Sequence, residues 1–192
     1  MSTLMRTSEI AKRPVVDMAG DDIAQVKDIV YAPGGGTVNG FTLAGRGLFS
    51  GPMKTALAWS SVTALGRDAV MVASPDSLGE LPADTSTGRR GHGDILGSRV
   101  LTDAGTDLGV VVDVIVEVGA GGEPCSVVGY EIKASEALGS AGTTMLIPLP
   151  DTMAASGEHL IVPASATDFV QQDLAGFGAS IDDFRRQLKG TS

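Results

Sequence analysis

The sequence predicts an all-β protein made of two small β-barrels of the same fold, packed as a pseudo-two-fold pair. Three observations lead to this prediction. The chain of 192 residues contains 26 glycines but only 4% aromatic residues, which indicates many tight turns and small cores. Short apolar and β-branched runs recur between glycine-rich turns, a pattern typical of small barrels. The runs also occur twice along the chain in the same order, which indicates an internal repeat.

The repeat is found by aligning residues 10–31 with residues 95–116 at an offset of 85. The offset grows to 89 and then to 90 toward the last strand, as insertions in loops would cause. We therefore predict one barrel over residues 8–74, a linker over residues 75–93 and a second barrel over residues 94–166. Aligned pairs include Val15 with Val100, Gly20 with Gly105, Asp28 with Asp113, and Gly40 with Gly129.

Each repeat is expected to consist of strands separated by turns. Ser8 and Asp94 precede short apolar stretches and are suitable caps for one helical turn, so a short helix is expected at the start of each repeat. The linker is rich in Pro, Gly, Ser and Thr, and we expect it to be at least partly flexible. The expected strands cover residues 23–31, 37–43, 53–59 and 69–74 in the first repeat and residues 108–118, 125–133, 143–149 and 159–162 in the second.

The small size of each repeat predicts contact between the two. A domain of about 65 residues buries only ~60% of the surface of its unfolded chain and is marginally stable alone. Two like domains can bury surface against each other in an isologous contact, in which the same patch of each takes part. We expect this side-by-side arrangement rather than two independent domains.

The C-terminal tail, residues 167–192, is expected to be helical. Its apolar residues step by three and four, which is the spacing of one helix face. Gly176 and Gly178 interrupt the pattern and a capping box follows, so we predict two short helices, the second over residues 181–189. We favour packing of the tail on the second barrel; the alternative is that its apolar stripe binds a partner. The stripe includes Ile181, Phe184 and Leu188.

A second candidate for partner binding is the loop at residues 44–53. It places Leu48, Phe49 and Met53 near glycines, where large apolar side chains are unexpected. If these side chains are exposed, they form a docking patch. The alternative, which we slightly favour, is that they close the mouth of the barrel or the contact between the repeats.

The charge of the chain limits the classes of partner. The net charge is −9, and residues 94–166 carry two basic and ten acidic residues, whereas residues 8–74 are neutral. Nucleic-acid binding needs a basic surface and is not expected, whereas a protein partner with a basic surface suits this charge; a homo-oligomer is also left open. No stretch approaches the roughly 18 apolar residues of a membrane helix. Residues 1–14 lack the apolar segment of a secretory leader, and we expect a cytoplasmic protein.

No catalytic, cofactor-binding or metal-binding set can be assembled from the sequence. Asp28 and Asp113 occupy equivalent strand positions without a nucleophile, and we expect them to accept turn N–H bonds or to face solvent. His92 lies in the linker and His159 stands alone at a strand start, so neither indicates a metal site. Cys125 is expected to be a buried, unreactive thiol. The sequence therefore predicts a protein that is not an enzyme and uses no cofactor.

The first repeat resembles the PRC-barrel family. The resemblance rests on its opening pattern and on the V-x-G-F strand that follows. The second repeat keeps several of these positions but has Leu149 in place of Trp59. The residues that carry the resemblance are Val15, Val16, Asp17, Gly20, Ile23, Val26, Lys27, Asp28 and Val30, followed by Val38, Gly40 and Phe41.

This resemblance implies a small all-β barrel that acts as an adaptor to other proteins or to RNA–protein assemblies, and it implies no active site. The family includes a domain of the photosynthetic reaction-centre H subunit and a domain of a ribosome-maturation factor. We expect an adaptor or scaffold that mediates protein–protein assembly. Two alternatives stay open, a ribosome- or RNA-associated maturation factor and a sensor that binds a small ligand in the cleft between the barrels.

Overall fold

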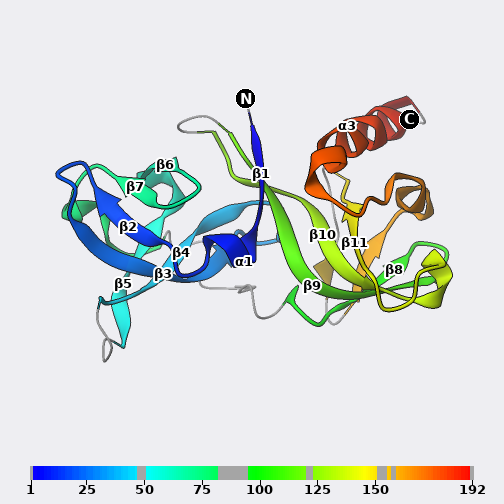
Figure 1. The fold of residues 1–192 in the computed structure, drawn as a ribbon, viewed down its shortest axis with the longest axis horizontal. Helices are drawn as coiled ribbons and strands as arrows, with labels where there is room; N and C mark the ends of the chain where they lie inside the picture. The colour runs from blue at the N-terminus through cyan, green and yellow to red at the C-terminus, as the bar shows by residue number, and fades with distance from the viewer. Residues whose placement is uncertain are drawn as a thin grey trace.

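The computed structural model describes residues 2–46, 51–81, 95–119, 123–150, 155–156 and 159–190. It shows an all-β fold of two sheets with few helices, which confirms the predicted fold class (Figure 1). Among the described residues, no helix is long and apolar enough to cross a membrane. The strands are β1 Thr3–Arg6, β2 Pro14–Asp17, β3 Asp22–Tyr31, β4 Val38–Ala44, β5 Pro52–Ala58, β6 Val62–Leu65, β7 Val70–Val72, β8 Arg99–Thr102, β9 Asp107–Val118, β10 Ser126–Ala134, β11 Thr144–Pro148, β12 Ala155–Ser156 and β13 His159–Val162. The helices are α1 Thr7–Ile10 and α3 Leu174–Gly190, with short 3-10 helices η1 Trp59–Ser61, η2 Pro75–Ser77, η4 Glu136–Leu138 and η5 Ala164–Phe169.

The two sheets have the same strand order. The first runs β5-β4-β3-β2-β7-β6, and the second runs β11-β10-β9-β8-β13-β12. In each sheet one pair of strands is parallel, β2 with β7 and β8 with β13. Val15 pairs with Val70 in the first of these ladders, and Val100 pairs with Leu160 in the second. The alignment of the two repeats equates these pairs, so the correspondence seen in the sequence extends to the register of the strands.

The turn after the first strand of each sheet uses glycine at the same place. Gly20 has a φ of 90° and Gly105 a φ of 82°, which side chains with a Cβ rarely adopt. The Asp17 carboxylate accepts two backbone N–H bonds within the first turn. The Thr102 hydroxyl accepts one in the second. A polar side chain bonded to the turn backbone, together with a glycine of positive φ, fixes each reversal of the chain.

Strand β1, which the sequence analysis did not predict, joins the two sheets. It precedes the first sheet in the chain but pairs with β9 of the second, from Thr3 beside Val118 to Arg6 beside Ile115. Figure 1 shows β1 and α1 between the two sheets. A strand of four residues carries too little alternation to be recognised in a sequence. Its stability comes from a ladder whose other strand lies in the other repeat.

A second contact between the sheets is close to two-fold symmetric. The N–H of Val38 donates to the carbonyl of Cys125 at 2.8 Å, and the N–H of Val127 donates to the carbonyl of Gly36 at 2.9 Å. Val38 aligns with Val127, and Gly36 aligns with Cys125. Each hydrogen bond is therefore the counterpart of the other, as an isologous contact requires.

One hydrophobic core extends through both sheets. Its main cluster includes the buried Tyr31 and Phe41 from the first repeat and Tyr130 from the second. Because this apolar surface is buried jointly, separation of the repeats would expose it to water, which is unfavourable. The expectation that two small repeats stabilise each other is consistent with this shared core.

The start of the predicted linker packs on the first sheet. Gly79 forms an isolated antiparallel bridge with Ala56 of β5, and Leu78 packs against the main core. Residues 82–94, which include the predicted helix cap Asp94, lie outside the described residues. The expected flexibility of the linker and the second short helix stay predictions, as do the domain boundaries.

The prediction of two short helices in the tail was wrong, because α3 is a single helix of 17 residues. Gly176 and Gly178 lie in its interior, where each costs about 1 kcal/mol relative to alanine. Burial of one large apolar side chain contributes about 1.5–3 kcal/mol. Packing of the helix on the second sheet therefore outweighs the cost of its glycines. The buried residues of α3 are Phe177, Ser180, Ile181 and Phe184.

Candidate interaction site

The loop that was predicted to carry a docking patch is only partly described. Leu48 and Phe49 lie outside the described residues. Met53, in β5, is half-buried and packs against the main core. This position fits the alternative in which the apolar residues of the loop help to close the barrel.

The C-terminal helix uses its apolar stripe within its own chain. Ile181 is 3% exposed, Phe184 is fully buried, and Leu188 is half-buried against the main core. The ring of Phe184 lies 5.5 Å from that of Phe169, measured between centroids. In this conformation the apolar stripe packs on the second barrel of its own chain and is not available to a partner.

The outer face of the second sheet carries several apolar side chains, and α3 covers only part of them. The covered part contains Ile115, Val128 and Leu146, which form a separate cluster with Phe177 and Ile181 of the helix. Figure 1 shows α3 at one end of this sheet, close to β10 and β11. The outer face of β8, β13 and the first half of β9 lies beyond the helix.

We call the uncovered part the outer patch, formed by Leu101, Val110, Val112 and Ile161. Val112 is 45% exposed and Ile161 is 41% exposed, and the other two side chains are half-buried. Ile161 pairs with Leu101 across the β13–β8 ladder. Exposed apolar side chains grouped on a sheet face suit a surface that binds another macromolecule.

Both basic residues of the second repeat lie beside the outer patch. Arg99 of β8 and Lys133 of β10 are the cross-strand neighbours of Val110. Arg99 donates a hydrogen bond of 2.8 Å to Asp107, so its charge is partly balanced. Lys133 is exposed. The patch is therefore an apolar surface with a weakly basic rim on an otherwise acidic repeat.

The buried carboxylate of Asp113 binds α1 of the first repeat to the second sheet. It is 4% exposed and accepts hydrogen bonds from Thr7 Oγ1 at 2.8 Å, from the Ser8 N–H at 3.2 Å and from the Ser8 hydroxyl. The backbone N–H of Val114 donates to it at 2.8 Å. Buried carboxylates are stable when hydrogen-bonded in this way. These hydrogen bonds give Asp113 a structural role in the contact between the repeats.

An ion pair beside this carboxylate strengthens the contact. Arg6 of β1 donates two hydrogen bonds of 2.9 Å, from Nε and Nη2, to the two carboxylate oxygens of Glu131. These bonds raise the pKa of Arg6 above its ordinary value. Bidentate pairs of arginine and carboxylate are among the stronger hydrogen-bonded contacts in proteins. We call residues 3–10, which form β1 and α1, the clasp, since they hold the first repeat on the second.

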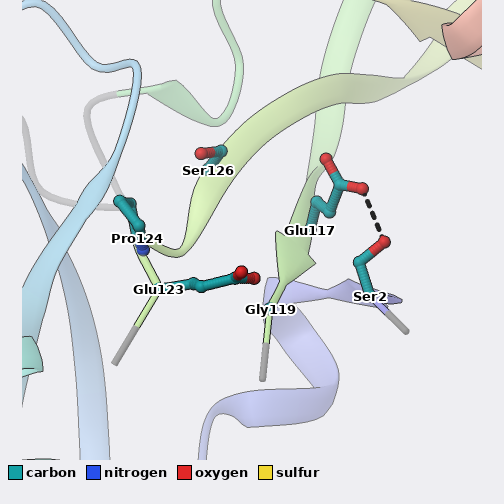
Figure 2. Close-up of a pocket in the computed structure, with 6 residues that line it drawn as sticks. All are labelled: Ser2, Glu117, Gly119, Glu123, Pro124 and Ser126. Carbon is teal, nitrogen blue, oxygen red and sulfur yellow. Dashed lines mark hydrogen bonds between the residues drawn. The ribbon is translucent and has the colours of Figure 1, made fainter. Parts of the chain in front are cut away.

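A polar hollow lies at the seam between the repeats (Figure 2). Its volume is about 440 Å³, and the carboxylates of Glu117 and Glu123 line it. Ser2 donates a hydrogen bond of 2.7 Å to Glu117. Trp59 of the first repeat donates from Nε1 to the carbonyl of Glu123 at 2.9 Å. The lining consists of Ser2, Glu117, Gly119, Glu123, Pro124 and Ser126.

Two further reactive side chains of the described residues, those of Cys125 and His159, differ in their burial. Burial raises the pKa of Cys125 to about 12, so the thiol stays protonated at neutral pH. His159 is exposed at the start of β13, and His92 lies outside the described residues. In the part of the chain that the structure describes, no three His, Cys, Asp or Glu side chains are grouped as a metal site would require.

Comparison with known proteins identifies the first repeat. The family model of the PRC-barrel domain matches residues 2–78. No curated protein matches the chain at a significant level. The match starts at the clasp and ends just after η2, so it includes β1 although this strand pairs with the second sheet.

Proposed function

We propose that the chain is a non-enzymatic adaptor that mediates protein–protein assembly, on the premise that residues 2–78 match the family model of the PRC-barrel domain. The single observation that carries the proposal is the outer patch. A sheet face whose apolar side chains are covered by its own helix in one part and exposed in another is suited to bind a second protein.

The chemistry of the patch defines the partner surface that fits it. Its four apolar side chains require apolar contacts in return. The paired Arg99 contributes little net charge, and Lys133 alone favours an acidic group at the rim. The rest of the second repeat is strongly acidic, which would attract a partner with basic regions over longer distances.

The test is a double substitution in the patch, Val112→Asp with Ile161→Asp. Full burial of such side chains contributes about 1.5–3 kcal/mol each. Since roughly half of each is exposed and free to be buried, the pair should weaken binding by about 10- to 100-fold. Met18→Asp is the matched control, because Met18 is 63% exposed but lies in the β2–β3 turn of the first repeat.

The assay recovers partners from cells by cross-linking and affinity purification, and then titrates the purified partner against each variant. We expect loss of binding for the double variant and wild-type binding for the control. Equal binding by all three proteins would refute the patch as the binding surface. The recovery is repeated with nuclease, because RNA-dependent recovery would favour the RNA-associated alternative.

The hollow at the seam favours a second candidate function, the binding of a small cationic ligand. Two carboxylates and the hydroxyl of Ser2 line it, and such a lining suits an amine with hydrogen-bond donors. The test is a thermal-shift screen of amines with the wild-type protein and with Glu117→Gln. Melting curves that no amine shifts would remove this candidate.

A further inference from the structure

The segment that follows each repeat contacts the edge strand of that repeat in the same way. In the first repeat, Ala56 N–H donates to the Gly79 carbonyl at 2.6 Å, and Gly79 N–H donates back at 2.9 Å. In the second, Leu146 and Gln171 exchange the same two bonds, at 2.7 and 3.0 Å. Ala56 and Leu146 occupy equivalent positions in β5 and β11. The arrangement is therefore a repeated feature of the fold.

Each of these segments then places a large apolar side chain over an equivalent glycine. A Cβ on Gly40 would lie 2.3 Å from the carbonyl oxygen of Leu57 and 2.6 Å from Leu81 Cδ2. A Cβ on Gly129 would lie 2.7 Å from the carbonyl oxygen of Ile147 and 2.5 Å from Phe177 Cζ. Atoms this close overlap, so glycine leaves room both for the neighbouring strand's carbonyl and for the covering apolar side chain. Gly40 and Gly129 are thus sockets for an apolar side chain. We call residues 78–81 the strap, and the edge of β5 at Ala56 together with Gly40 the strap site.

The two sites differ in how firmly they are covered. In the second repeat the covering segment continues into α3, which buries Phe177, Ile181 and Phe184. In the first repeat the strap contributes only Leu78 and Leu81, which are both half-buried. The strap is therefore held by much less buried apolar surface than the helix.

The surroundings of the strap site are suited to an acidic segment. Lys54 and Thr55, which precede Ala56 in β5, are exposed. Within the described part of the chain, Ala56 makes the one bridge that β5 forms on this side. The strap itself carries the acidic Glu80, which is exposed. A positive charge beside an incompletely paired edge strand favours an extended acidic ligand.

We propose that the strap site is an exchangeable peptide-binding site. The strap fills it in cis, and an extended acidic segment of a partner protein takes its place. This segment has a small residue at the bridge to Ala56 and a large apolar residue two positions later, for the Gly40 socket. The site lies on the first sheet, so the inference does not depend on the outer patch of the second.

The test titrates the full-length protein with a synthetic peptide of the sequence PDSLGEL, which is that of residues 75–81. The single tryptophan, Trp59, follows β5 directly and reports binding through its fluorescence. Leu81→Ala empties the socket of its cis occupant and raises the fraction of molecules with an open site, so it should bind the peptide about tenfold more tightly than wild type. A peptide with alanine in place of its last leucine should not bind.

Leu188→Ala is the matched control, since it removes the same volume from a half-buried leucine of α3. It should bind the peptide as wild type does. If Leu81→Ala does not fold, Leu81→Val should show a smaller gain in the same direction. Absence of saturable binding to any variant, or an equal gain for Leu188→Ala, would overturn the proposal. A dimer of the protein alone that the peptide converts to monomer would assign the site to a second copy of the chain instead.

Discussion

The substitution Asp113→Ala removes the acceptor that binds the clasp to the second sheet. Thr7 is fully buried and donates to this carboxylate, as does the N–H of the buried Val114. A hydrogen bond to a charged group contributes about 1.5–3 kcal/mol, and a buried donor left without an acceptor loses at least that much. The two bonds from Ser8 are partly exposed, and water can replace them. We therefore expect a loss of about 3–5 kcal/mol in the free energy of unfolding.

Two variants make this prediction specific. Asp28 occupies the equivalent position in the first repeat, is half-buried, and accepts one hydrogen bond from the described residues, that of the Ile29 N–H. Asp28→Ala should therefore cost only about 1 kcal/mol. Asp113→Asn keeps the Oδ1 acceptor that three of the four donors use. It should be closer to wild type than Asp113→Ala.

The assay is urea unfolding followed by the fluorescence of Trp59, whose indole N–H donates across the seam to Glu123. For a chain of this length, a loss of 3–5 kcal/mol lowers the melting temperature by roughly 6–20 °C. Hydrogen exchange of the β1 amides should also become faster in Asp113→Ala. If Asp113→Ala and Asp28→Ala have free energies of unfolding within about 1 kcal/mol of each other, the carboxylate does not hold the clasp.

Two further predictions concern the second repeat. Gly129→Ala brings a Cβ to 2.5 Å from Phe177 and 2.7 Å from the carbonyl of Ile147. It should destabilise the protein by roughly 1–3 kcal/mol and speed hydrogen exchange in α3. Gly190→Ala, which has open space around its Cβ, should have neither effect. The pKa of Cys125 is raised by burial from 9.0 to about 12. The neutral thiol therefore contributes stability that is complete below pH 9 and is lost as the pH rises toward 12. A thiol reagent at pH 8 should react slowly with the native protein and at once in urea; rapid reaction with the native protein would contradict this.

The strands were predictable because their pattern is repeated. Positions such as Val15 and Val100 are apolar in both copies, and loops of different length shift the alignment without disturbing it. The same logic fails for the clasp, since β1 has no second copy among the described residues and gains its stability from β9. Sequence reasoning also fails for α3, because local sequence alone predicts that its internal glycines interrupt the helix. The burial that overrides the glycines depends on a sheet distant in sequence.

The sockets illustrate what a sequence alone cannot show about a site. Gly40 and Gly129 align with each other, so both are visible as equivalent glycines. The side chains that fill them come from unlike segments, Leu81 of a short strap and Phe177 of a long helix. No alignment of the repeats pairs these two residues. Pairing with the neighbouring strand already requires glycine at both positions, and the second use of this space, by a covering side chain, becomes clear only when the covering segment is placed on the sheet.

The two repeats share one sheet architecture but differ in the segments that cover it. The sheets share strand order, turn glycines and sockets, so these features serve the fold. The coverings differ, because a 17-residue helix seals one end of the second sheet while a short strap closes the first site. In our proposals, the second repeat binds a partner through the part of its sheet that α3 leaves exposed, and the first repeat binds one by exchange of its weakly held strap. If partner specificity differs between related chains, it should therefore follow the segments after each repeat and the exposed sheet face, while the shared core stays the same.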